Sequence, residues 1–460
     1  METRYNLSFA TGVSGATATL WVTLARRWGI KRRLLKSLSA NTCLLCMLLL
    51  FSRCDSTPDM GPAPGSGKEA AENKGVLTSV KTVTTVDGAT AQVTCSEEVL
   101  PSGEIIQICV PALWNGELIL YAHGYVPAFL PLSLPDEVTA YMPLFTSIGF
   151  AFATTSFDRN GIAILTGIDN MLALRAKFIA QYGEPKHTYL TGGSQGGIIT
   201  TLALERYPAL FDGGLSLCGP CGYFQGQVNY YGNFRVLFDY YFPGVLPGNA
   251  IHIPLELQQN WESKYVPLVL QAINQNPNAT IKLLKTALAP FDPDNPATIA
   301  ETVIGVLTYD VLYTENAQRV LGGQPFDNTK QVYFGTGNFR EDLRLNLRVQ
   351  RFSGDKAALR TIRENYETSG DLARPLVSAH TTKDPIVLFW NMPIYHAKTI
   401  YQGKSHYFTQ IPVSRYGHCA FIEQEIMLSF TTLAFKVQGQ ALFAKASDAE
   451  GRIVRSVTSD

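Results

Sequence analysis

The run Gly192-Gly193-Ser194-Gln195-Gly196 constrains the fold of this chain more than any other segment. An apolar stretch over 187–191 precedes it and a helical pattern over 195–207 follows it, so the sequence predicts a strand, a tight turn and a helix. Such a turn would hold the Ser194 hydroxyl exposed on a strained backbone. Side chains at the flanking glycines would collide with neighbouring backbone.

The turn pattern alone is weak, because the chain contains 38 glycines in 460 residues and could carry Gly-x-Ser-x-Gly by chance. Its interpretation therefore depends on the remaining residues. With 46% hydrophobic residues, the chain can bury one large core and still accommodate an insertion.

Strand-like and helical patterns alternate before and after residues 222–370, which have a different pattern. Residues 76–221 begin with β-like runs and continue with strands and helices in turn, and residues 371–445 resume that alternation. This is typical of an α/β fold with a mostly parallel central sheet and helices on both faces. Residues 222–370 are aromatic and helical in pattern, so we expect an inserted, mainly helical cap, and residues 446–460 form a polar tail.

The N-terminus has the pattern of an export signal. Basic residues at 31–36 precede nine apolar residues at 43–51, too few to span a bilayer. Cys54 follows in a loose lipoprotein-type context, so lipidation at Cys54 is one expectation, with plain signal cleavage or a retained anchor as alternatives. We therefore assign 31–54 as a signal segment, 55–75 as a flexible linker, and 1–30 as an upstream extension consistent with a mis-assigned start.

Charge argues against a nucleic-acid partner. Eight of the 38 Lys/Arg but one of the 38 Asp/Glu lie in 1–54, which leaves 30 basic and 37 acidic residues in 55–460, a net charge of −7. Nucleic-acid binding needs an excess of basic residues to contact the phosphates, and residues 55–460 have no such excess.

Two further residues follow predicted strands in the order that a nucleophilic serine needs. A serine hydroxyl becomes a good nucleophile when a histidine accepts its proton and a carboxylate orients that histidine. Asp384 comes after the strand-like run 376–380, and His418 comes after the run 407–411. The alternatives are that Asp384 caps the next helix and that His418 is structural.

In this arrangement the chain resembles the α/β-hydrolase superfamily over about residues 80–440. Asp384-Pro-Ile-Val is similar to the acid loop, and Gly417-His418-Cys-Ala-Phe to the histidine loop. Tyr121-Ala-His-Gly-Tyr125 is similar to the oxyanion loop. The resemblance implies an oxyanion hole made by the N–H groups of Gln195 and Tyr125, with Gly124 or Val126 as alternatives to Tyr125.

The cysteines favour an oxidising compartment. Cys95 and Cys109 flank a turn between two strand-like runs and could close a hairpin as a disulfide. Cys218-Gly-Pro-Cys221 resembles a thioredoxin motif, in which the first cysteine lies at the start of a helix. Here the motif comes at the end of a strand, so we expect a local disulfide between its two cysteines. Cys419 is then left unpaired. No Cys/His pattern has metal-ligand spacing, so we expect no metal and no cofactor.

The sequence supports three hypotheses for function. The first is a bacterial exported serine hydrolase that cleaves carboxylic esters through an acyl-enzyme, with Ser194, Asp384 and His418 as catalytic residues. The second is a serine peptidase of the prolyl-oligopeptidase or aminopeptidase type, favoured if an acidic cap residue pairs with a substrate amine. The third is a non-catalytic binding protein on the same scaffold. The expected partner is a small-molecule ester or short peptide, with membrane attachment through lipidated Cys54. The oligomeric state stays open.

Overall fold

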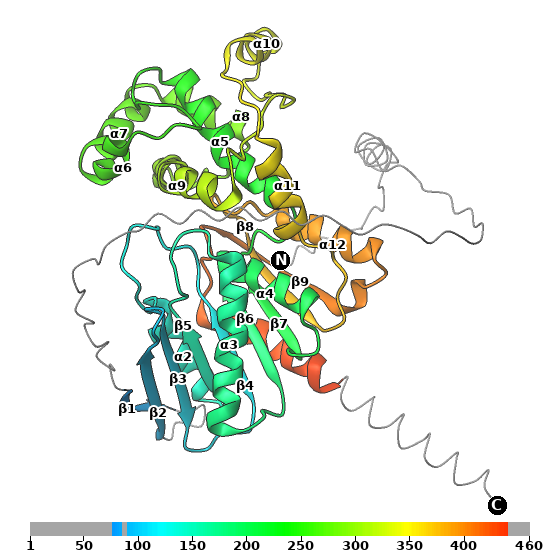
Figure 1. Ribbon diagram of the computed structural model, residues 1–460. Helices are drawn as coiled ribbons and strands as arrows, with labels where there is room; N and C mark the ends of the chain where they lie inside the picture. Colours follow the sequence, from blue (N-terminus) through cyan, green and yellow to red (C-terminus); the bar gives the residue numbers. More distant parts are fainter. Residues whose placement is uncertain (1–75, 85–89, 440–460) are drawn as a thin grey trace, which may run out of the picture. The chain divides into compact units, whose positions relative to one another are not determined.

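The structure is a computed structural model that describes residues 76–84 and 90–439. Within these residues one sheet has nine strands in the order β1-β2-β3-β5-β4-β6-β7-β8-β9 (Figure 1). The strands are β1 (Leu77–Thr84), β2 (Thr90–Val99), β3 (Ile105–Pro111), β4 (Leu118–Ala122), β5 (Ala151–Thr155), β6 (Thr188–Gly193), β7 (Gly213–Leu217), β8 (Leu376–Lys383) and β9 (Phe408–Tyr416).

Six neighbouring strands of this sheet run parallel. Strands β5, β4, β6, β7, β8 and β9 form the parallel part, and β1, β2 and β3 add an antiparallel edge beside β5. Because the carboxyl ends of parallel strands lie at the same edge, the segments that follow β4, β6, β8 and β9 meet there. Ser194, Asp384 and His418 all lie in such segments.

Helices cover both faces of the sheet because its strands alternate between two hydrophobic clusters. In β4, Leu118 and Leu120 face a cluster that includes α3 (Ile164–Tyr182), α4 (Gln195–Arg206) and α12 (Asn391–Tyr401). Ile119 and Tyr121 face the opposite cluster, with α2 (Glu137–Thr146) and a C-terminal helix over 423–439. The result is the three-layer arrangement that the alternation of strands and helices predicts.

The segment between β7 and β8 folds as a helical cap with its own hydrophobic cluster (Figure 1). It contains α5 (Phe224–Tyr241), α6 (Leu255–Gln259), a π-helical turn η1 (Trp261–Tyr265), α7 (Val266–Gln275), α8 (Pro277–Ala287), α9 (Ala297–Leu321), α10 (Phe339–Arg348) and α11 (Lys356–Asn365). Many of the aromatic residues of the cap pack in this cluster, as is usual for aromatic side chains.

A buried charge cluster joins α5 and α9 inside the cap. The Arg235 guanidinium is fully buried and donates to Asp239 at 2.9 Å and to Asp310 at 3.2 Å. Burial raises the pKa of Asp310 to about 7, although Arg235 acts in the opposite direction. One arginine therefore contacts two acidic side chains in an apolar interior, where burial favours the neutral form of Asp310.

The sequence pattern predicts a helix over 387–400, but α12 begins at Asn391, because the Asp384 carboxylate accepts the N–H groups of Ile386 and Val387 and holds these residues in a turn. Helix α2 contains Pro143, although proline is disfavoured in a helix interior.

The N-terminal assignments over 1–30, 31–54 and 55–75, including Cys54, and the tail over 446–460 lie outside the described residues. Within the described ranges no helix has the length and apolar character needed to cross a membrane.

Candidate active site

Ser194 lies in the turn between β6 and α4, with a backbone φ of 54° that few residues other than glycine adopt. A Cβ atom at Gly196 would overlap the carbonyl of Ala122, and one at Gly192 would overlap the carbonyl of Gly196. The Ser194 N–H donates to the Leu217 carbonyl at 2.8 Å, which ties the turn to β7. The turn thus has the glycine requirement expected from the sequence.

His418 lies between Ser194 and Asp384. Its Nε2 is 2.9 Å from the Ser194 hydroxyl, and its Nδ1 is 2.8 Å from Asp384 Oδ2. The loop that carries His418 is held by the Thr381 hydroxyl, which donates to the Gly417 carbonyl at 2.6 Å. With Nδ1–H donating to the carboxylate, Nε2 is free to accept the serine proton.

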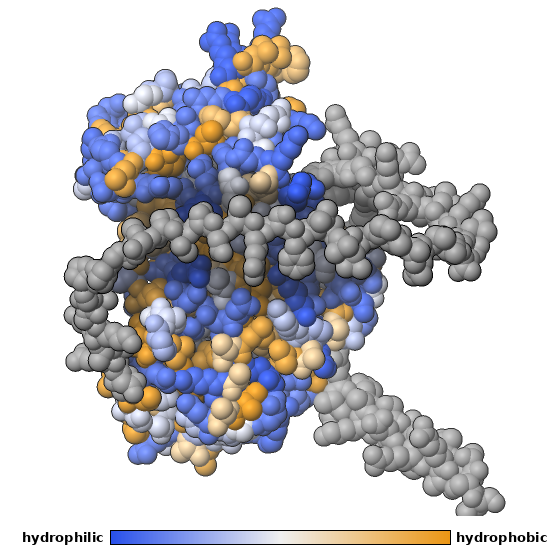
Figure 2. Space-filling view, in the orientation of Figure 1, coloured by the Kyte–Doolittle hydropathy of each residue, from blue (hydrophilic) through white to orange (hydrophobic). Residues whose placement is uncertain are grey.

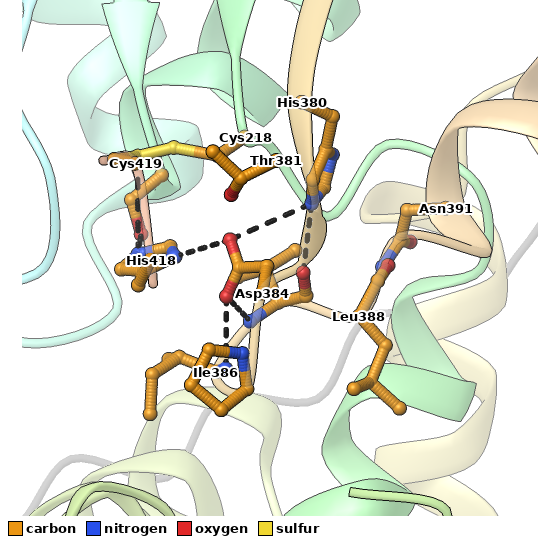
Figure 3. Close-up of polar contacts among 12 residues, drawn as sticks. Cys218, His380, Thr381, Asp384, Ile386, Leu388, Asn391, His418 and Cys419 are labelled. Atoms are coloured by element: carbon orange, nitrogen blue, oxygen red, sulfur yellow. Dashed lines mark hydrogen bonds and ion pairs between the residues drawn. A yellow bond between two sulfur atoms is a disulfide. The ribbon is translucent and has the colours of Figure 1, made fainter. Parts of the chain in front are cut away.

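Asp384 is fully buried directly after β8, and both of its oxygens are engaged (Figure 3). Oδ1 accepts the N–H groups of Ile386 and Val387 at 2.9 and 3.0 Å, and Oδ2 faces His418. Burial alone would raise the pKa of Asp384, but His418 and His380 stabilise the carboxylate and hold the pKa at about 2. The side chain both fixes its turn and keeps its negative charge.

His380 is a second histidine beside this carboxylate (Figure 3). Its Nε2 is 3.6 Å from Asp384 Oδ2 and 2.7 Å from the Val387 carbonyl. The ring is 1% exposed and reaches across the turn that follows β8. It therefore closes residues 384–387 into a compact loop.

Several backbone N–H groups near Ser194 have no acceptor among residues 76–84 and 90–439. They include that of Gln195, at the first position of α4, and those of Gly124, Tyr125 and Val126 in the loop after β4, so the alternatives to Tyr125 stay open. A Cβ atom at Gly124 would lie 3.5 Å from the Ser194 Cβ, so this loop packs directly beside the serine. Unpaired donors in such a place can receive an oxyanion.

Cap helix α9 holds the loop after β4 by two links. The Tyr125 hydroxyl donates to the Leu312 carbonyl at 3.0 Å. The Gly161 N–H donates to the Val126 carbonyl at 2.8 Å, and the next N–H along the chain donates to Asn316 Oδ1 at 2.8 Å. The position of the Tyr125 N–H therefore depends on contacts with the cap.

The surroundings of His123 indicate that this residue has a structural role. Its ring is 1% exposed and stacks on Phe157 with centroids 4.0 Å apart, and its Nδ1 lies 2.7 Å from the Gly124 carbonyl. Burial lowers the pKa of His123, which favours the neutral ring.

The disulfides differ in part from the expected pairs. Cys95 and Cys109 are opposite each other on β2 and β3 and form a disulfide, as the hairpin pattern indicates. The expected Cys218–Cys221 bridge is wrong, because Cys218 pairs with Cys419, 201 residues further along the chain. This bridge joins the end of β7 to the residue after His418 (Figure 3).

Cys221 is a free, buried thiol. Its sulfur points toward α4, 3.1 Å from the Thr201 hydroxyl and 3.3 Å from the Ser216 hydroxyl. Burial raises the pKa of this thiol to about 11, which keeps it protonated and unreactive. The turn after β7 directs Cys221 away from Cys218, so nearness in sequence did not indicate the pair.

A narrow cavity of about 40 Å³ opens onto Ser194 beneath the cap. Its lining is apolar or neutral and consists of Tyr125, Ile164, Ser194, Gln195, Pro220, Phe224, Gln227, Tyr231, Tyr309, Tyr313 and Val387. The buried Gln195 Nε2 has no hydrogen-bond partner in the described chain. An uncharged group with an apolar body fits such a lining.

Tyr309 is a site residue that the sequence did not indicate. Burial and the Asp384 charge raise its pKa to about 12, and a hydrogen bond with Ser194 lowers it. Tyr309 and Tyr313 lie one turn apart on α9 and both line the cavity. That i, i+4 tyrosine spacing was the available signal, but without the packing of α9 in the cap it does not identify a site.

Among the described residues, one cluster of three potential metal ligands occurs, formed by Cys218, His418 and Cys419. The two sulfurs are bonded to each other, and the imidazole faces Ser194 and Asp384. The two sulfurs and both imidazole nitrogens therefore already have other partners.

The parallel sheet, the serine turn between β6 and α4, and the acid and histidine segments after β8 and β9 define a class of protein. The chain is an α/β-hydrolase by fold, as the sequence resemblance implied.

Comparisons with known proteins add more specific similarities. A family model described as a tannase-like family of unknown function (DUF6351) matches residues 102–322. Feruloyl esterase B from Aspergillus oryzae is 14% identical over 77% of this chain and 82% of its own, with a TM-score of 0.45. Acylaminoacyl peptidase from Pyrococcus horikoshii is 11% identical over 79% of this chain and 42% of its own, with a TM-score of 0.37. The rice cell-wall-degrading esterase LipA from Xanthomonas oryzae is 15% identical over 78% of this chain and 96% of its own, with a TM-score of 0.38. No curated protein matches the chain.

Proposed function

We propose that this protein is a serine hydrolase that cleaves carboxylic esters through an acyl-enzyme. The observation that carries the proposal is the placement of His418, with one ring nitrogen at the Ser194 hydroxyl and the other at the Asp384 carboxylate. The unpaired backbone N–H groups of Gln195 and of the loop after β4 support the same chemistry.

In this mechanism Ser194 Oγ attacks the ester carbonyl while His418 Nε2 accepts the hydroxyl proton. The N–H groups of Gln195 and Tyr125 stabilise the oxyanion of the tetrahedral intermediate. His418 then gives the proton to the leaving alcohol, and a water molecule, activated by the same nitrogen, hydrolyses the acyl-enzyme. Asp384, ionised because its pKa is about 2, orients His418 and stabilises the imidazolium.

The lining of the cavity favours esters over peptides with a free amine. Recognition of an ammonium group requires a carboxylate in the pocket, and no acidic side chain lines the cavity at Ser194 in the described chain. Among the acids of the cap, Glu256 instead pairs with Lys264, and both are about half exposed. We therefore propose an uncharged acyl group with an apolar body.

A fluorophosphonate probe tests the nucleophile. We expect the wild-type chain and Ser414→Ala, which changes an exposed serine on β9, to be labelled, and Ser194→Ala to remain unlabelled. An unlabelled wild type would exclude the hydrolase and favour a binding protein. Labelling of Ser194→Ala would show that the nucleophile is another residue.

Kinetics on matched substrates test the reaction. We expect kcat/KM on p-nitrophenyl esters to exceed that on aminoacyl and prolyl p-nitroanilides by orders of magnitude. The opposite preference would replace the esterase with a peptidase of the prolyl-oligopeptidase or aminopeptidase type.

Export and lipid attachment also belong to the proposal. The Cys95–Cys109 and Cys218–Cys419 disulfides support folding in an oxidising compartment. We expect mass spectrometry of the cell-envelope protein to find a lipid on Cys54, and Cys54→Ser to release the chain. An unmodified Cys54 in the mature protein would refute lipid attachment.

A further inference from the structure

Helix α10 carries an apolar stripe on its outer face, at the projecting end of the cap (Figure 1). Phe339, Leu343 and Leu347 recur every four residues and are 80%, 52% and 76% exposed. The loop before the helix adds Val332 and Phe334, which are 65% and 58% exposed. A gathering of large apolar side chains in water, outside the catalytic cavity, needs an explanation of its own.

A row of arginines runs beside this stripe. Arg340, Arg344 and Arg348 each follow a stripe residue by one position and are exposed. None of the three guanidinium groups is paired with a carboxylate among residues 76–84 and 90–439. In Figure 2 hydrophobic and strongly hydrophilic surfaces lie side by side at this projecting end.

The inner face of α10 shows that the exposed face is not an accident of a loosely attached helix. Leu345 is fully buried in the cap cluster, and Glu341 pairs with Lys282 at 2.6 Å. Asp342 accepts the Thr336 N–H at 3.0 Å. Glu341 thus points toward α8 and Asp342 toward the loop that precedes α10, and neither lies in the row of exposed apolar residues or in the row of arginines.

We propose that this outer face, defined as Val332, Phe334, Phe339, Arg340, Leu343, Arg344, Leu347 and Arg348, docks the cap onto an anionic phospholipid surface. Phenylalanine and leucine side chains enter the boundary between headgroups and acyl chains, and the arginines meet the lipid phosphates. The body of the chain is acidic, with a net charge of −7 over 55–460, so this local basic row departs from the overall charge.

A second copy of the chain fits this face poorly. In a two-fold dimer the arginine row would meet itself, with no carboxylate on this face to balance it. A lipid surface does not have this problem, and the sequence expectation of a lipid on Cys54, followed by the linker 55–75, would keep the chain near one.

Vesicle binding by the full chain tests the proposal. We compare phosphatidylcholine vesicles with equimolar phosphatidylcholine and phosphatidylglycerol vesicles, using sedimentation. The face variant is Phe339→Ser/Leu343→Ser/Leu347→Ser. The matched control changes three exposed apolar residues elsewhere, Leu113→Ser/Ile400→Ser/Leu428→Ser, which are 80%, 58% and 62% exposed. Both variants should keep the wild-type melting temperature and fluorophosphonate labelling.

We expect the wild type and the scattered control to bind the anionic vesicles and the face variant to lose at least tenfold in partition coefficient. Replacing the arginine row (Arg340→Gln/Arg344→Gln/Arg348→Gln) should lower partitioning by on the order of 100-fold, since each basic residue contributes about fivefold near an anionic surface. Equal binding by the face variant and the control would overturn the proposal, because another part of the chain would then hold the membrane.

A local reporter separates binding by this face from binding elsewhere. In Phe339→Trp, the added indole emission should shift to the blue and be quenched by brominated phosphatidylglycerol, in difference spectra against the wild type. An unchanged indole in a chain that sediments with vesicles would overturn the proposal. A blue shift that depends on protein concentration without vesicles would also overturn it, and would identify a second copy as the occupant.

Discussion

The Tyr125 side chain provides a sharp test of how the cap contributes to the proposed catalysis. Tyr125→Phe removes one hydroxyl, which donates to the Leu312 carbonyl of α9 at 3.0 Å, and leaves the ring and the backbone N–H unchanged. If that hydrogen bond holds the N–H in place for the oxyanion, its loss should appear in the transition state and not in substrate binding.

The magnitude follows from the kind of bond that is lost. A neutral hydrogen bond contributes about 1 kcal/mol net, which corresponds to roughly fivefold in rate. Complete loss of one oxyanion donor costs about 10²–10³ in kcat and sets the upper limit. We therefore expect kcat to fall roughly fivefold while KM stays within about twofold.

The assay is steady-state hydrolysis of a p-nitrophenyl ester, together with thermal melting. The matched control is Tyr366→Phe, which removes the hydroxyl of a buried tyrosine that lies outside the cavity lining. An unchanged kcat in Tyr125→Phe with a lower melting temperature would refute the reasoning, because the hydroxyl would then serve stability alone. A rise in KM alone would refute it as well.

Three further predictions address the site and the cap. Asp384→Asn should lower kcat by on the order of 10³–10⁴-fold, because the amide supports the wrong tautomer of His418; near-normal kcat would exclude Asp384 as the orienting acid. Replacing Cys218 and Cys419 by serine should cost about 2–4 kcal/mol and lower kcat, whereas removing the β2–β3 disulfide should affect melting alone; equal kcat in both would show that the bridge does not position His418. Asp310 has a folded pKa raised to about 7, so its stability contribution is present below its unfolded pKa and is lost as the pH rises through about 7. The melting temperature should therefore fall between about pH 4 and 7 in the wild type and stay flatter in Asp310→Asn; parallel curves would contradict this.

The positions of the candidate catalytic residues could be anticipated because they depend on chain order. Ser194, Asp384 and His418 each follow a strand, and in a parallel sheet the carboxyl ends of the strands share one edge. That rule brings side chains together without knowledge of any individual contact. The glycine requirement at Ser194 was likewise local, since it arises from the backbone of one turn.

Features that depend on packing between distant segments could not be anticipated. The Cys218–Cys419 pair joins residues 201 positions apart, and the spacing of Cys218 and Cys221 favoured a shorter bridge. Tyr309 reaches Ser194 only because α9 packs in the cap with a particular register. Hydrophobic periodicity shows which face of a helix is buried but not what that face meets.

The turn that carries Asp384 is part of the hydrophobic interior of the cap. Ile386, Val387 and Leu388 belong to the cap cluster, and the Tyr230 hydroxyl of α5 donates to the Pro385 carbonyl at 2.8 Å. The cap is therefore not an exchangeable module that can be transplanted between scaffolds at β7 and β8. A chimera that imports a foreign cap would have to import residues 385–388 as well, or it would lose the orientation of its own acid. If the proposed function holds, selection for a new substrate through cap mutations is limited in the same way, because changes near α5 would alter specificity and turnover together.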